Sequence, residues 1–347
     1  MTPPMSARIP EEWLLSLADP MGPRPSLPDG RLRAAELGPL WTEADRHGVL
    51  PAFAANLQAV IREQGMERVM AGEPGAQERL EDALSAARAR ILTRTGLSLM
   101  LRRQLRTITP ALAGLGLPTV VLKGPDFCDR LYPEPVLRPF TDIDLLAPPE
   151  AVPQVEEALA ALGYRAEAAP GRKHAEGYGE RSWRLSDSTA GTVEVHWDLV
   201  NSPPMRRRVS VGYADLQLEE AGGTLRPTAS ALLAIAAVHG ATGHRFDRLQ
   251  VLCDVCQAAR GAAGALDEGW LGDFGRRTGS AEVMATALWL AGEALGEPRC
   301  AELRERLFGR LPGPMLRLLL GPQVVLRSQR PLARLRRQLY RELLKRR

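Results

Sequence analysis

Two aspartates, Asp142 and Asp144, alternate with apolar residues in the stretch Thr141–Leu146. Alternate residues of a β-strand point to the same side, so the two carboxylates would share one face and Ile143 and Leu145 the other. Two carboxylates about 7 Å apart along a strand repel each other unless a cation lies between them. Hard oxygen ligands of this kind suit Mg²⁺ or Mn²⁺. The alternative is a pair of solvated acids at the end of an edge strand.

A third acid, Glu194, lies in a second alternating stretch, Thr192–Trp197. On a strand, Glu194 and His196 would share the face opposite the apolar residues. A third carboxylate beside Asp142 and Asp144 would complete a two-metal site, which stabilises both the attacking and the leaving oxygen of a displacement at phosphorus. His196 is a candidate ligand or substrate contact. Taken alone, Glu194 would be interpreted as a surface acid and His196 as a structural histidine.

A phosphate site is predicted at Lys123-Gly124-Pro125, which follows a short β-branched run. Pro125 suits the first turn of a helix. The free N–H groups and the dipole at the start of that helix favour an anion, and Gly124 permits close backbone approach. Lys123 would add a point charge for the same phosphate. Arg138 would reach a phosphate or form an ion pair with one of the acids.

The elements that must position these residues fall into three regions, and the fold class they predict is α+β. Residues 1–112 have helix-like apolar spacing, residues 113–227 mix strands with helices, and residues 228–347 are helical again. The predicted strands of the middle region are 118–122, 143–147, 164–168, 181–186 and 192–199. The predicted helices are 32–47, 51–64, 76–112, 149–162, 230–239, 247–260, 280–296 and 299–309.

The net charge of +4 is unevenly distributed. Residues 324–347 contain nine basic residues and one acid, so the rest of the chain carries about −4. The body is therefore not a broadly basic nucleic-acid binder, and nucleic acid is not expected as a partner. In the basic tail, leucines recur at helical spacing between arginines, which predicts an amphipathic helix. A helix packed on the domain and a peripheral contact with an anionic membrane or an acidic partner are both consistent with it.

The composition favours a reduced, cytoplasmic protein. Four cysteines in 347 residues indicate no disulfide framework. No apolar run approaches the roughly 20 residues that span a bilayer, and the first residues lack the apolar segment of a signal peptide. Cys253 and Cys256 have CxxC spacing, but no second pair completes a zinc site, so they are interpreted as core thiols. His174, in a Gly- and Glu-rich stretch, is a candidate substrate contact.

In their order, these motifs resemble the polymerase-β nucleotidyltransferase superfamily, and more closely the bacterial family known as uncharacterised nucleotidyltransferases. The similarity runs from about residue 85 to 260. It rests on these pieces: Leu122-Lys123-Gly124, Leu131-Tyr132-Pro133, Arg138, Asp142-Ile143-Asp144-Leu145-Leu146, Leu162-Gly163-Tyr164, Glu194-Val195-His196-Trp197, and His239-Gly240-Ala241 followed by His244 and Leu249.

The resemblance implies a nucleotidyltransferase-fold mixed sheet flanked by helical regions. Asp142 and Asp144 would bind both metal ions, Glu194 would bind the ion that activates the acceptor hydroxyl, and Lys123 with Gly124 would hold the donor triphosphate. Two departures stand out. The superfamily usually has Gly-Ser where this chain has Lys123-Gly124, and it commonly has Asp where Glu194 stands.

The predicted function is Mg²⁺- or Mn²⁺-dependent transfer of a nucleoside monophosphate from an NTP to a small molecule or a peptide. Catalysis would come from positioning and from charge neutralisation. Two alternatives stay open. One is a non-catalytic, nucleotide-binding regulatory protein on the same fold. The other is a sugar or phosphate transferase that tailors a peptide natural product.

Overall fold

The structure is a computed structural model that describes residues 9–167, 177–186, 191–309 and 312–346. His174 lies outside the described residues. Its strands are β1 (Val120–Leu122), β2 (Asp142–Leu146), β3 (Tyr164–Ala166), β4 (Glu180–Leu185), β5 (Thr192–His196), β6 (Leu218–Ala221) and β7 (Thr224–Pro227). Its helices before the sheet are α1 (Ile9–Leu17), α2 (Ala34–Arg46), α3 (Leu50–Gln64), α4 (Met66–Val69) and α5 (Ala76–Gly114). Those among and after the strands are α6 (Gly124–Leu131), α7 (Val152–Ala161), α8 (Pro203–Arg206), α9 (Ala229–Thr242), α10 (Leu249–Ala259), α11 (Glu268–Arg277), α12 (Ala281–Leu295), α13 (Pro298–Phe308), α14 (Pro314–Leu319), α15 (Pro322–Leu326) and α16 (Pro331–Lys345).

Five strands form one mixed sheet in the order β1-β2-β5-β4-β3. β2 runs parallel to β5, whereas β1 pairs with β2, β4 with β5 and β3 with β4 in the antiparallel direction. The parallel register places Asp144 directly beside Glu194. The antiparallel register places Glu180 of β4 beside His196. This mixed sheet between helical regions confirms the predicted α+β class.

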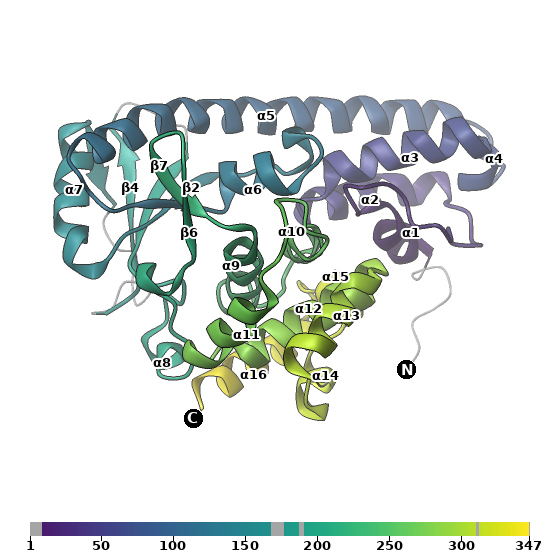
Figure 1. Ribbon diagram of the computed structural model, residues 1–347. Coiled ribbons are helices and arrows are strands. Elements are labelled where there is room, and N and C mark those ends of the chain that lie inside the picture. The colour runs from purple at the N-terminus through teal and green to yellow at the C-terminus, as the bar shows by residue number, and fades with distance from the viewer. Residues whose placement is uncertain (1–8, 168–176, 187–190, 310–311, 347) are drawn as a thin grey trace.

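The two faces of the sheet have different neighbours. Ile143, Leu145, Val193 and Val195 are buried on one face, where they share a hydrophobic cluster with residues of α5 and α7. The alternation along β2 and β5 leaves the polar residues for the other face. Figure 1 shows α5 running along one side of the molecule, over the sheet at one end and over α2 and α3 at the other, with α9 and α10 on the opposite side of the sheet. Polar side chains of β2 and β5 line a cavity to which α9 also contributes.

The helices before and after the sheet share one hydrophobic core. This cluster joins Trp13 and Phe53 of the N-terminal helices to Leu252 of α10 and Leu288 of α12. The three regions predicted from the sequence are thus packed against one another. Their proposed boundaries, residues 112/113 and 227/228, stay predictions. The hairpin β6–β7 and helix α11 are elements that the sequence analysis did not predict.

The observed cysteines agree with the interpretation as core thiols. All four are free and buried, and the Sγ atoms of Cys256 and Cys300 lie 3.8 Å apart.

Among the described residues, no helix combines the length and the apolarity that crossing a bilayer requires.

The completely buried side chain of His47 links helices that are distant in sequence. Its Nδ1 accepts a hydrogen bond from the backbone N–H of Leu249 at 3.2 Å, so Nε2 carries the proton of the neutral ring. Nε2 donates that proton to the carbonyl of Leu326 at 3.2 Å. Burial, together with the charge of Arg46, lowers the pKa of His47 to about 3.

Acid should therefore destabilise the fold through His47. The unfolded chain binds a proton below about pH 6.5, whereas the folded chain resists protonation down to about pH 3, so stability falls as the pH falls through this window. Between pH 6.5 and about pH 5 the loss should be roughly 1–2 kcal/mol. We expect His47→Gln to show a flatter dependence of unfolding free energy on pH in urea titrations. Equal slopes for both proteins would contradict this assignment.

Candidate active site

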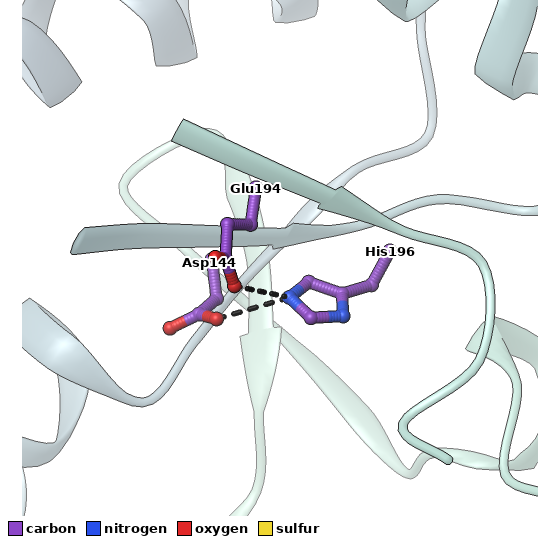
Figure 2. A group of neighbouring side chains, drawn as sticks. All are labelled: Asp144, Glu194 and His196. Carbon is purple, nitrogen blue, oxygen red and sulfur yellow. Dashed lines mark hydrogen bonds and ion pairs between the residues drawn. The ribbon is translucent and has the colours of Figure 1, made fainter. Parts of the chain in front are cut away.

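The parallel pair β2–β5 brings two carboxylates and an imidazole together. Figure 2 shows Asp144, Glu194 and His196 pointing toward one another from the two strands. The Nε2 atom of His196 lies 3.0 Å from Oδ1 of Asp144 and 3.5 Å from Oε2 of Glu194. Each of the three residues offers a ligand atom within 4.8 Å of the others. The structure thus brings together Asp144, Glu194 and His196, which were candidates in the sequence analysis.

His196 is buried and stands between acids on both sides of its ring. Its Nδ1 lies 3.4 Å from Oε2 of Glu180 but forms no hydrogen bond with it. Burial would lower the pKa of His196, but hydrogen bonds to Asp144 and Glu194 outweigh it and raise the pKa to about 10. The imidazole is therefore protonated at neutral pH when no metal ion is bound. A bound cation would have to displace that proton.

Lys123 supplies the second positive charge of the site. Its Nζ lies 2.8 Å from Oδ1 of Asp144 and donates a hydrogen bond to Nδ1 of His239 at 3.2 Å. Burial would raise the pKa of Asp144, but Lys123 and the hydrogen bond from His196 lower it below its ordinary value. Burial and the charge of Lys123 keep the pKa of His239 well below its ordinary value, which suits an imidazole that accepts a hydrogen bond.

The backbone at Lys123 and Gly124 is unusual. Lys123 has φ 44° and Gly124 has φ 37°, and Lys123 directly precedes α6. A positive φ is strained for a residue with a Cβ, and such strain concentrates at functional sites. A Cβ on Gly124 would lie 3.4 Å from the carbonyl oxygen of Asp142. The strand–Lys–Gly–helix turn that the sequence predicted is therefore present, with Gly124 close to the backbone of β2.

Asp142 lines the same cavity but lies outside the close group of Asp144, Glu194 and His196. Burial and the neighbouring charge of Asp144 raise the pKa of Asp142 to about 7. Burial is the larger of these two causes, so the shift reflects mainly the loss of water around the Asp142 carboxylate. The role of Asp142 as a metal ligand stays a prediction.

Arg138 forms an ion pair with Asp254, which is distant in the sequence. Its Nε and Nη2 donate to the two carboxylate oxygens of Asp254 at 2.7 and 2.8 Å, and the hydroxyl of Tyr132 donates to the same carboxylate at 2.7 Å. The guanidinium also lies over the ring of Phe127, 5.0 Å from its centroid. Arg138 lines the cavity without pairing with Asp142 or Asp144 in the structure. A contact between Arg138 and a donor phosphate stays a prediction.

The cavity has a volume of ≈ 390 Å³, and all three regions of the chain contribute to its wall. Asp45 and Arg94 come from the N-terminal helices, while His239 and Arg248 come from α9 and the turn before α10. The segment between these two helices is strained, because Arg245 and Phe246 both have positive φ values of 54° and 51°. Arg337 of α16 holds this segment by donating to the carbonyls of His244 and Arg245.

Two site residues were not recognised from the sequence. Glu180 opens β4 and lies beside His196 only because of the antiparallel register. His239 was named only as a piece of the family resemblance, and the structure places its ring in contact with Lys123. The sequence shows a histidine near the end of an apolar helix. It does not show that the partner of this histidine is Lys123, 116 residues away.

The donor set fits a divalent cation. Two carboxylates and one imidazole converge, and the carboxylates of Asp142 and Glu180 line the same cavity. Lys123 and protonated His196 balance only part of this charge. Carboxylate oxygens suit Mg²⁺ and Mn²⁺, and neutral imidazole is a common ligand of transition metals. The residues present therefore suit a hard divalent ion held mainly by carboxylates.

The mixed sheet carries converging carboxylates on two adjacent parallel strands, and a strand–Lys–Gly–helix turn precedes them. This is the arrangement expected for a nucleotidyltransferase. The chain belongs to the family described as "Uncharacterised nucleotidyltransferase", whose model matches residues 34–296, about three quarters of the sequence. The comparisons found no matching curated protein and no matching solved structure.

Proposed function

We propose that this protein is an enzyme that transfers a nucleoside monophosphate from an NTP to a hydroxyl group of a small molecule or a peptide, in a metal-dependent reaction. The observation that carries the proposal is the convergence of Asp144, Glu194 and His196 in a cavity that Lys123 also lines. In the reaction, the acceptor oxygen would form a bond to the α-phosphorus as the bond to the pyrophosphate oxygen breaks. The hydroxyl proton would pass to solvent, and pyrophosphate would leave.

Each side chain of the site would have a different role in this reaction. Asp142, Asp144 and Glu194 would hold Mg²⁺ or Mn²⁺, and His196 is a further ligand candidate. A bound ion of this kind would neutralise phosphoryl oxygens and favour deprotonation of the acceptor hydroxyl. Lys123 and the backbone of Gly124 would bind the donor phosphates at the start of α6.

Arg138 is a weaker candidate for the donor phosphates than Lys123. Both oxygens of Asp254 already accept hydrogen bonds from its guanidinium, so a phosphate would compete with an existing ion pair. The fixed orientation of the guanidinium would still leave its positive charge at the wall of the cavity. We therefore rank Arg138 below Lys123, and its contact with a donor phosphate stays a prediction.

One observation favours a non-catalytic nucleotide-binding protein as the second candidate. The ammonium of Lys123 and the protonated ring of His196 both contact Asp144, so this carboxylate is neutralised without a metal ion. A protein that binds a nucleotide through the same cavity would not need to release pyrophosphate. Metal-dependent pyrophosphate release separates the two functions.

The test is a panel of nucleoside triphosphates and nucleotide sugars, each supplied with Mg²⁺ or Mn²⁺ and a set of hydroxyl-bearing small molecules and peptides. Nucleotide binding is measured by calorimetry, and products are identified by mass spectrometry. We expect the acceptor to gain the mass of a nucleoside monophosphate and pyrophosphate to be released only with metal. Gain of a hexosyl or a phosphoryl mass would replace the proposal with the sugar or phosphate transferase, and tight binding without turnover would favour the second candidate.

A further inference from the structure

Helices α14 and α16 present a group of apolar side chains to solvent. The exposed fractions are 57% for Met315 and 63% for Leu318 of α14, and 67%, 56% and 46% for Leu332, Leu335 and Leu339 of α16. The two helices are in contact, and Arg336 of α16 donates a hydrogen bond to the carbonyl of Leu318. These five residues form what we call the α14–α16 patch.

The patch is exposed although α16 is packed against the rest of the protein. The opposite side of α16 is buried through Ala333, Arg337, Tyr340 and Leu344. Arg337 donates to the carbonyls of His244 and Arg245, so the inner face of α16 is firmly attached to the rest of the protein. Helix α16 therefore has two apolar stripes, and the packing of the protein accounts for only one of them.

The segment that carries the patch is rich in arginine. Residues 306–341 contain nine arginines and no aspartate or glutamate, and the next acid in the sequence is Glu342. Arg317 and Arg334 are among the exposed arginines on the two helices. Exposed leucines beside exposed arginines complement a layer that offers hydrocarbon below and anionic groups above.

We propose that the α14–α16 patch docks on an anionic lipid surface, with α16 lying in the plane of the membrane interface. The 15 residues of α16 correspond to about 22 Å of helix, which suits a helix that lies on a bilayer. Leucines would enter the boundary between headgroups and acyl chains, and the arginines would contact lipid phosphates. A second copy of the chain fits less well, because its patch would bring arginines against arginines.

The proposal is tested by co-sedimentation of the full chain with vesicles. One set contains phosphatidylcholine mixed with phosphatidylglycerol, and the other contains phosphatidylcholine alone. We expect binding to the mixed vesicles that weakens as salt is added, because salt screens the attraction. A triple variant with glutamine at Leu332, Leu335 and Leu339 should bind at least tenfold more weakly, because these three side chains would no longer transfer apolar surface from water into the bilayer. Each of Arg317→Gln and Arg334→Gln should weaken it about fivefold.

The matched control replaces Leu92, Leu99 and Met100 of α5 with glutamine, because these side chains are 71%, 61% and 49% exposed on another arginine-rich helix. This variant should bind vesicles like the original chain, and circular dichroism should show that all variants keep their helices. Three results would overturn the proposal. They are absence of binding to anionic vesicles, an equal loss in the α5 control, and a dimer in light scattering that only the α16 variant abolishes.

Discussion

The Asp144→Asn variant should lose transferase activity by on the order of 10³-fold while remaining folded. Asp144 is the residue on which the site converges, since it contacts Lys123 and His196 and lies beside Glu194 on the neighbouring strand. The amide of asparagine has the same shape but lacks the negative charge that would hold a divalent ion. The initial rate of pyrophosphate release, measured under saturating Mg²⁺ and NTP, gives the size of the effect.

The control for this experiment is Asp82→Asn, which makes the same chemical change on the exposed surface of α5. Its rate should equal that of the original chain. Circular dichroism and the melting temperature show whether Asp144→Asn has kept its fold, because the substitution also leaves Lys123 buried without its carboxylate partner. A folded Asp144→Asn protein with unchanged turnover would remove the proposed metal site.

The largest effect on stability is expected for Asp254→Asn. Asp254 is 3% exposed and pairs with both nitrogens of the Arg138 fork, while Tyr132 donates to the same carboxylate. Removing the charge leaves the guanidinium buried without a counter-charge, which typically costs about 3–5 kcal/mol. Unfolding in urea, followed by circular dichroism, measures the loss as a lower midpoint.

An exposed ion pair of similar geometry provides the comparison. Arg102 donates to both oxygens of Asp129 at 2.7 Å, but the Asp129 side chain is 48% exposed, so Asp129→Asn should cost no more than about 1 kcal/mol. The double variant Arg138→Met with Asp254→Leu removes both buried charges and should recover part of the stability that Asp254→Asn loses. Equal, small losses for Asp254→Asn and Asp129→Asn would show that the buried pair contributes little.

The sequence was sufficient to predict the parts of the site that depend only on a local pattern of residues. Alternation along two short strands predicted that Asp142 and Asp144 share a face and that Glu194 and His196 share a face, because side chains in a strand alternate with a period of two. The break at Lys123-Gly124 predicted the turn before α6 for an equally local reason. The convergence of Asp144 with Glu194 depends further on the parallel pairing of β2 and β5, which the structure shows and the sequence analysis did not predict.

Residues that depend on contacts between distant segments could not be identified in this way. Arg138 was expected at a phosphate or at one of the predicted acids, yet its partner Asp254 is 116 residues away on α10. Glu180 reaches His196 only through the pairing of β4 with β5. No pattern in a single sequence specifies which helix packs over which strand, so these neighbours became visible only in the assembled fold.

The attachment of α16 to the segment around His244 has a consequence for the shape of the cavity. Positive φ at two successive residues with side chains, Arg245 and Phe246, costs about 1–3 kcal/mol at each position, so this bend persists only while other contacts impose it. Arg337 provides two such contacts from α16, and its neighbours along the helix face outward. Since His244 lines the cavity, the shape of this part of the cavity wall depends on how α16 packs against the bend.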